Sequence, residues 1–99
     1  MDIYNKSLDE MLERNSLHFQ KDFDNLSKYQ VNFLRMLTDG VTENFYANEN
    51  ITKYNLGSSS NIVTVLKSLE QKEFIDRFEG TVEFIDPAFK IWAGRIMRR

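Results

Sequence analysis

The fold of this chain is decided by residues 50–87, which read NITKYNLGSSSNIVTVLKSLEQKEFIDRFEGTVEFIDP. A short helical segment comes first, over 51–56, with Asn50 placed to cap it and the turn residue Gly57 placed to end it. Serine then opens a longer helix over 58–72. Its apolar residues fall within about 100° of one face: Ile62, Val65, Leu66 and Leu69. The pattern predicts two helices joined by a tight turn.

The second of these helices leads directly into a hairpin over 74–86. Both arms are rich in β-branched and aromatic residues, and Glu79-Gly80 between them is a two-residue turn signal. Pro87 ends the second arm, because proline interrupts a strand. Two helices joined by a turn, with the second running into a two-stranded ribbon, are typical of a winged helix. Winged helices bind DNA in some proteins and dock onto proteins in others, so the fold leaves the function open.

Further helices are expected on both sides of this segment. Residues 7–10 (SLDE) and 27–30 (SKYQ) both fit a capping box. The first predicts a helix over 8–22, and the second predicts a helix that ends at Gly40, where a C-terminal cap glycine belongs.

Residues 41–49 lack a clear period and are expected to form a loop, with a candidate short strand at 45–46. A short closing helix with basic ends is expected within 87–99. The predicted fold class is mainly α with a small β-hairpin, a winged helix-turn-helix with extra helices at both ends. We expect one domain over 1–99, made of an N-terminal connecting helix (1–25), a winged-helix core (26–86) and a C-terminal helix (87–99).

Composition narrows the class of protein. The chain has 99 residues, of which 41% are hydrophobic and 28% charged, as expected for one globular domain. No apolar run approaches the ~20 residues that a membrane-spanning helix needs. The absence of cysteine excludes disulfides and thiolate chemistry and favours a cytoplasmic location. The net charge of −2 predicts no general attraction to nucleic acid.

The charges are unevenly distributed along the chain. The net charge is −3 over 1–25, +1 over 58–72, −4 over 73–86 and +4 over 87–99. Over 73–86, Arg77 is the single basic residue against five carboxylates. The predicted wing is therefore acidic, while the end of the chain is basic.

We expect no catalytic, cofactor or metal site. The phosphate-binding patterns GxxxxGKS/T and GxGxxG are absent. His18 is the only histidine and there is no cysteine, so a zinc site is disfavoured and His18 is interpreted as an ordinary helix residue. The serines lack an accompanying base and oxyanion hole, and the acidic runs are interpreted as solvated surface. The sequence therefore predicts that the chain is not an enzyme.

One helix face has the side chains to contact DNA. If helix 58–72 entered a major groove, the candidate DNA-binding residues are Ser59, Ser60, Asn61, Thr64, Lys67 and Lys72. Asparagine pairs bidentately with adenine, and the lysines reach phosphates. Alternatively, the serines cap the helix and its polar face is simply solvated. DNA binders neutralise roughly 6–10 phosphates, whereas this helix has two lysines and lies beside an acidic wing, which favours docking onto protein.

Several aromatic residues exceed the needs of a minimal winged helix: Phe45, Tyr46, Tyr54, Phe78 and Trp92. We interpret them first as core residues on which the added helices pack. The alternative is a docking surface for another domain or for a second copy of the chain in a homodimer.

Four motifs occur together and in order: LSKYQ (26–30), LGSSSNI (56–62), LKSLEQK (66–72) and FIDPAFKIW (84–92). With them the chain, over about residues 17–95, resembles the C-terminal MarR-like winged-helix domain of prokaryotic AAA-type (STAND-related) P-loop ATPases. In that family a strand runs into Asp-Pro, followed by an aromatic residue and a Trp. Asp86-Pro87, Phe89 and Trp92 match this ending. Glu73 departs from the family, where many relatives have glycine or a small residue before the first wing strand.

The resemblance implies that the chain is a fragment or stand-alone relative of a larger ATPase. The nucleotide would bind in a domain outside this chain, so no ATP-binding residue is carried over. In the family this domain is thought to bind DNA or to dock onto the ATPase domain. The first functional hypothesis is therefore a non-catalytic regulatory or docking module, and the second is a sequence-specific DNA-binding domain. A continuous positive stripe would favour DNA, formed by Lys67, Lys72, Arg95, Arg98 and Arg99. An acidic wing beside an apolar patch would favour docking.

Overall fold

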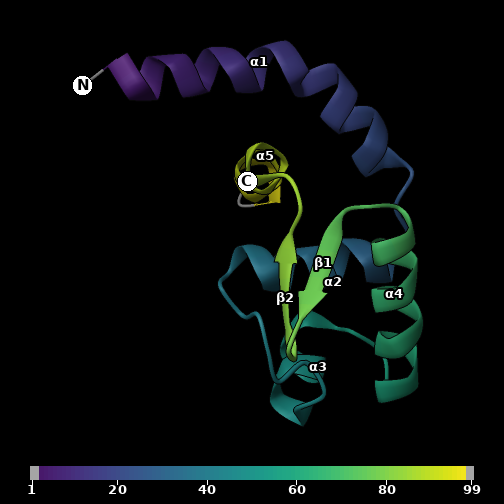
Figure 1. Cartoon of the computed structure of the whole chain (residues 1–99). Coiled ribbons are helices and arrows are strands. Elements are labelled where there is room, and N and C mark those ends of the chain that lie inside the picture. The colour runs from purple at the N-terminus through teal and green to yellow at the C-terminus, as the bar shows by residue number, and fades with distance from the viewer. Residues whose placement is uncertain (1–2, 98–99) are drawn as a thin grey trace.

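The computed structural model describes the backbone of residues 3–97 and the side chains of residues 7–97. Its elements are, in chain order, α1 (Ile3–Asp24), α2 (Lys28–Thr38), α3 (Asn48–Tyr54), α4 (Ser59–Gln71), β1 (Ile75–Phe78), β2 (Thr81–Phe84) and α5 (Pro87–Met97). Figure 1 shows α1 lying across one end of the molecule, with α5 beneath it and the hairpin, α2, α3 and α4 beyond. The chain is mainly helical with one antiparallel hairpin, which confirms the predicted winged helix with added helices at both ends.

The helix that decides the fold forms as predicted. Ser58 caps α4, because its Oγ accepts a hydrogen bond from the Asn61 amide at 3.2 Å. The four residues of the predicted apolar face are all buried: Ile62, Val65, Leu66 and Leu69. This face packs on α2 and β1. The opposite face is exposed to solvent, as its polar composition predicted.

The hairpin also forms as predicted. Its strands pair Ile75 with Phe84 and Arg77 with Val82, and Ile75 and Val82 are buried on the side of the core. The turn Glu79-Gly80 has φ values of 49° and 86°. Two consecutive left-handed residues are typical of the two-residue turn that matches the twist of the strands. The backbone at Thr42 lies along the other edge of β2, where its carbonyl accepts a hydrogen bond from the Val82 amide at 3.0 Å.

Helix α2 has both of its predicted ends. Ser27 and Gln30 form the capping box reciprocally, with distances of 2.7 and 3.3 Å between the backbone amides and the side-chain oxygens. At the other end the Gly40 amide donates to the Leu37 carbonyl, and the amide of Val41 donates to that of Met36. Gly40 has φ +95°, so a glycine is favoured where this helix ends.

The predicted start of α1 is wrong. Ser7 lies inside the helix, which begins at Ile3, although the SLDE pattern fits a cap. Because the preceding turn is already helical, the amides that a capping serine would satisfy are paired within the helix.

The predicted bounds of the short third helix are also wrong. Asn50 lies inside α3, where its Nδ2 donates to the Asn44 carbonyl at 2.9 Å and fixes the preceding loop instead of capping the helix. The helix ends before Gly57, because Asn55 adopts a left-handed conformation with φ 54°. Asparagine tolerates this conformation better than most residues. The candidate strand at 45–46 is a turn.

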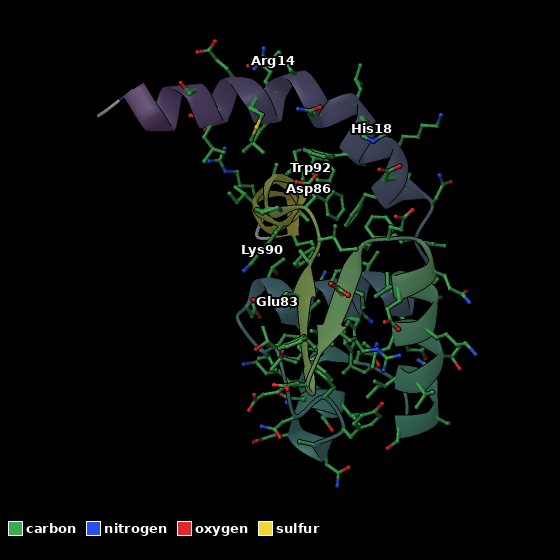
Figure 2. All side chains as sticks on the ribbon, viewed as in Figure 1. Arg14, His18, Glu83, Asp86, Lys90 and Trp92 are labelled. Atoms are coloured by element: carbon green, nitrogen blue, oxygen red, sulfur yellow. The ribbon has the colours of Figure 1, made fainter. Side chains whose placement is uncertain are left out.

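The extra aromatic residues divide into two groups. Phe45, Tyr54 and Trp92 are buried, as the core interpretation predicted, while Tyr46 and Phe78 are exposed. Trp92 lies between α5 and α1 (Figure 2), where its ring packs on Phe19 at a centroid distance of 5.7 Å. Trp92 therefore joins α5 to α1, while Phe78 remains exposed on the hairpin.

Replacing Glu73 by glycine is expected to raise the free energy of unfolding by about 1 kcal/mol. Glu73 joins α4 to β1 with φ 64°, a left-handed conformation that costs a residue with a Cβ roughly 1–2 kcal/mol and glycine little. Urea denaturation followed by circular dichroism measures the gain. Gln71→Gly is the matched control: at the last residue of α4, where the backbone is still helical, the same substitution should cost up to about 1 kcal/mol. A loss of stability in Glu73→Gly would contradict the assigned strain.

Candidate functional site

The structure brings together four of the six candidate DNA-binding residues on the exposed face of α4: Ser59, Ser60, Thr64 and Lys67. Two of the hydroxyls already have local contacts. Ser60 Oγ lies 3.1 Å from Ser58 Oγ, and Thr64 Oγ1 donates weakly to the Ser60 carbonyl at 3.4 Å. These hydroxyls remain exposed, so they are accessible to a ligand.

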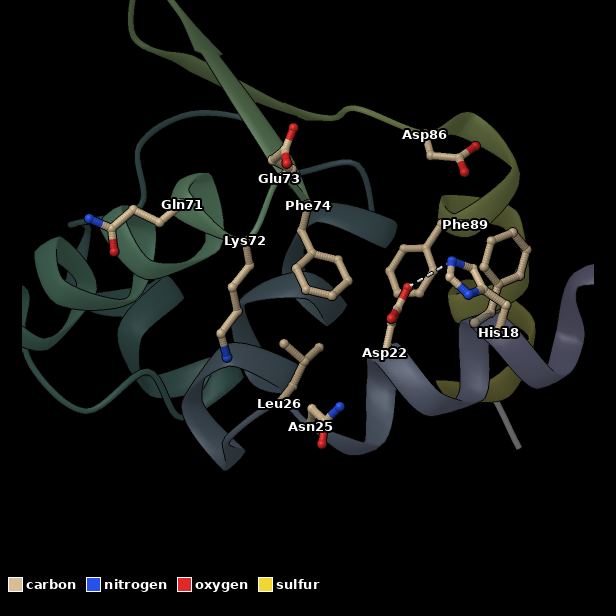
Figure 3. A pocket seen from close by; sticks show the side chains of 11 residues that line it. His18, Asp22, Asn25, Leu26, Gln71, Lys72, Glu73, Phe74, Asp86 and Phe89 are labelled. Carbon is tan, nitrogen blue, oxygen red and sulfur yellow. Dashed lines mark ion pairs between the residues drawn. The ribbon is translucent and has the colours of Figure 1, made fainter.

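The other two candidates are placed differently. Asn61 is half-buried, and its Nδ2 donates to the Leu56 carbonyl at 2.7 Å, so the amide holds the turn between α3 and α4. Lys72 lies at the far end of α4, about 20 Å along the helix axis from Ser59 at 1.5 Å per residue. In Figure 3 its side chain extends toward Leu26, at the junction of α1 and α2. Neither side chain is positioned to join the other four.

The wing is electrostatically acidic, because its one basic residue is engaged within the chain. Arg77 Nε and Nη2 donate to Glu70 Oε1 on α4 at 2.9 and 2.6 Å. The hydrogen bonds from Arg77 lower the pKa of Glu70, and the same bonds raise the pKa of Arg77. Both groups are therefore held in their charged forms, and they neutralise one another. The wing presents Asp76, Glu79 and Glu83 to solvent without a compensating cation of its own.

The continuous positive stripe that would favour DNA does not form among the described residues. Arg95 Nη1 lies 3.0 Å from Asp9 Oδ1, which pairs α5 with α1. Both helices lie at the end of the molecule away from the N-terminus of α4 (Figure 1). Of the other members, Lys67 lies on α4 and Lys72 is the residue that caps its C-terminal end. Arg98 and Arg99 lie outside the described residues.

A hollow of about 540 Å³ lies between α1, the start of α5 and the turn from α4 to β1. Figure 3 shows Phe74 and Phe89 toward its base and charged residues around it. His18 Nε2 and Asp22 Oδ2 are 3.4 Å apart on its α1 side, and both side chains are solvent-accessible. Glu73 and Asp86 approach from the other side. Residues 7–97 contain no group of three or more His, Asp or Glu side chains that could hold a metal ion.

A second, smaller hollow of about 300 Å³ lies on the hairpin face that points away from the core. It is lined by Asp76, Phe78, Thr81, Glu83, Phe84 and Ile85. Sequence reasoning singled out Phe78 but missed Ile85, which is 50% exposed. Alternation along the strands was the available signal, since Ile85 is two residues beyond Glu83 and therefore shares its face.

Among residues 3–97, no helix is long and apolar enough to cross a membrane. Searches of curated proteins and of solved structures found no significant match to the chain. A family model described as a probable winged helix domain matches residues 17–95, which is most of the chain and includes α2 to β2 in full. The arrangement of α3, α4 and the hairpin agrees with this match. The chain therefore belongs to the family of probable winged helix domains.

Proposed function

We propose that this chain is a non-catalytic winged-helix module that regulates or docks onto another protein. The observation that carries the proposal is the acidic wing, whose one arginine is paired within the chain, as is an arginine of α5. Arg77 of the wing is bound to Glu70, and Arg95 of α5 is paired with Asp9. An acidic wing repels the DNA backbone, whereas a protein surface of opposite charge complements it.

The number of available phosphate contacts supports the same proposal. Proteins that bind duplex DNA usefully make roughly 6–10 of them. The exposed face of α4 offers Lys67, with Lys72 about 20 Å along the helix from its N-terminus. Two lysines beside the acidic wing provide much less than this requirement.

The partner we propose is the ATPase domain of the same or a related polypeptide. The support is the resemblance carried by the four motifs, above all the ending from Asp86 to Trp92. In this chain the ending has a structural role: Asp86 Oδ1 accepts a hydrogen bond from the Ala88 amide at 2.9 Å at the start of α5, and Phe89 and Trp92 are buried. Catalysis would then reside in the ATPase domain. A second copy of the chain is the alternative protein partner.

A second candidate function is binding of double-stranded DNA through α4. The observation that favours it is the cluster of exposed hydrogen-bonding groups on one helix face: Ser59, Ser60, Thr64 and Lys67. Asn61 is left out of this candidate surface, because its amide is bonded to the Leu56 carbonyl.

The chain is expected not to bind a random pool of duplex DNA at micromolar concentration. Fluorescence anisotropy at ~50 and ~200 mM salt measures this, because phosphate contacts make affinity fall steeply with salt. Tight binding at the lower salt that weakens steeply at the higher one would overturn docking in favour of DNA. Lys67→Ala would then weaken binding to all sequences alike and reduce the salt slope by about 1.

A further inference from the structure

The hairpin has one face that the fold does not use. Its strands pair Asp76 with Glu83 directly opposite each other, on the side away from the core. Phe78 lies two residues from Asp76 toward the turn, and Ile85 lies two residues from Glu83 toward α5. Because side chains alternate along a strand, these four residues share one face, which we call the outer wing face. Figure 2 labels Glu83 on this hairpin.

The outer wing face has a regular order of chemistry. Phe78 at the turn is 74% exposed, the two carboxylates lie in the middle, and Ile85 lies at the base. Successive positions on one face are about 6.8 Å apart at ~3.4 Å per residue. The hollow of about 300 Å³ runs along these residues. The face therefore presents an apolar, acidic, apolar order to a ligand.

This order works against the stability of the isolated hairpin. Like charges directly opposite in an antiparallel pair repel each other, and neither Asp76 nor Glu83 has an ion-pair partner among the described residues. An exposed phenylalanine gains little from burial within the chain. Features that disfavour the fold without a local benefit are expected at functional surfaces.

The neighbouring backbone disfavours contact through the β2 edge of the hairpin. The Val82 amide points out of the hairpin on the β2 edge, where it is already bonded to the Thr42 carbonyl at 3.0 Å. A partner strand on that edge would have to displace this contact. The side chains of the outer wing face are accessible without any such change.

We propose that the outer wing face binds a protein segment in which one basic side chain lies between two apolar ones. The basic group would lie between the carboxylates of Asp76 and Glu83, and the apolar side chains would cover Phe78 and Ile85. Charge complementarity selects this occupant, because two unpaired carboxylates flanked by apolar side chains disfavour acidic or purely apolar segments. The inference rests on the proposed docking function and assigns it a surface and a class of partner.

The probe is a fluorescein-labelled peptide in which arginine has leucine two residues before it and phenylalanine two residues after it, with threonine between. A matched peptide carries glutamate in place of arginine. In anisotropy titrations with the full chain at ~50 mM salt, the arginine peptide is expected to bind at least about tenfold more tightly than the glutamate peptide. Equal affinities, or no binding of the arginine peptide up to about millimolar concentration, would overturn the proposal.

Three variants assign the binding to this face. Glu83→Lys is expected to abolish the preference between the two peptides, because the introduced cation lies opposite Asp76 and neutralises it. Phe78→Ser is expected to weaken the binding of the arginine peptide by about tenfold. Glu13→Lys makes the same charge change at an exposed position of α1 and should leave the preference intact. Equal effects of Glu13→Lys and Glu83→Lys would overturn the proposal, because general charge would then explain the binding.

The two possible failures are distinguishable. Tight, salt-sensitive DNA binding in the duplex assay would overturn the proposed docking function itself. If the chain binds no duplex and does not discriminate between the peptides, the proposed docking function stands, but the outer wing face is not its surface. Thermal melts by circular dichroism establish that each variant is folded, which is expected because all three substituted side chains are exposed.

Discussion

Replacing Phe89 by alanine is expected to lower the free energy of unfolding by about 3–5 kcal/mol. Phe89 is 4% exposed and lies at the centre of an aromatic cluster. Its ring centroid is 5.5 Å from that of Phe19, 5.2 Å from Phe74, 6.1 Å from Phe84 and 5.8 Å from Trp92. These rings come from α1, the hairpin region and α5, so the truncation removes contacts in three parts of the structure at once.

The measurement is urea denaturation followed by circular dichroism. Phe78→Ala is the matched control, since it removes the same atoms from a side chain that is 74% exposed and should change stability by no more than about 0.5 kcal/mol. The free energy of unfolding of a small domain is about 5–15 kcal/mol. The Phe89 variant should therefore remain folded but unfold at a measurably lower urea concentration, provided that the unchanged chain is stable by more than about 5 kcal/mol. Equal losses in the two variants would contradict the central position of Phe89.

The parts of the fold that the sequence predicted are those governed by local periodicity. The buried face of α4 follows from apolar residues at helical spacing, and the hairpin turn follows from Glu79-Gly80. The parts that it did not predict involve side chains with two competing uses. The Asn50 side chain can cap a helix or form a hydrogen bond with a loop. In this fold the Asn44 carbonyl lies within its reach, so the side chain bonds to the loop. Ser7 fits a cap only if the chain before it is not helical.

The exposed residues on α4 were predictable for the same reason, since a solvated face is the complement of a buried one. The electrostatics were not. Arg95 and Asp9 are 86 positions apart in the sequence, and their pairing depends on how α5 packs on α1. The bond from Arg77 to Glu70 likewise requires the hairpin to fold back beside α4. Counting charges along the chain identified an acidic wing but could not show which cations remain available.

Leu66→Ala is expected to cost about 2–5 kcal/mol, the range for truncating a buried leucine. Leu66 is 2% exposed and belongs to the face of α4 that packs on α2 and β1. The spread in the expected value reflects how far the neighbouring side chains can close the cavity, at ~24 cal/mol per Å³ left open. Urea denaturation measures the loss.

The matched control for this variant is Leu17→Ala on α1, where the leucine is 86% exposed and the change should cost no more than about 0.5 kcal/mol. An unchanged stability of Leu66→Ala would mean that α4 is rotated about its axis. Ser60, Thr64 and Lys67 would then point toward the body, since they lie opposite the buried face of the same helix. The experiment therefore tests the candidate DNA surface together with the core, because the orientation of α4 about its axis decides which of its residues are buried and which are exposed.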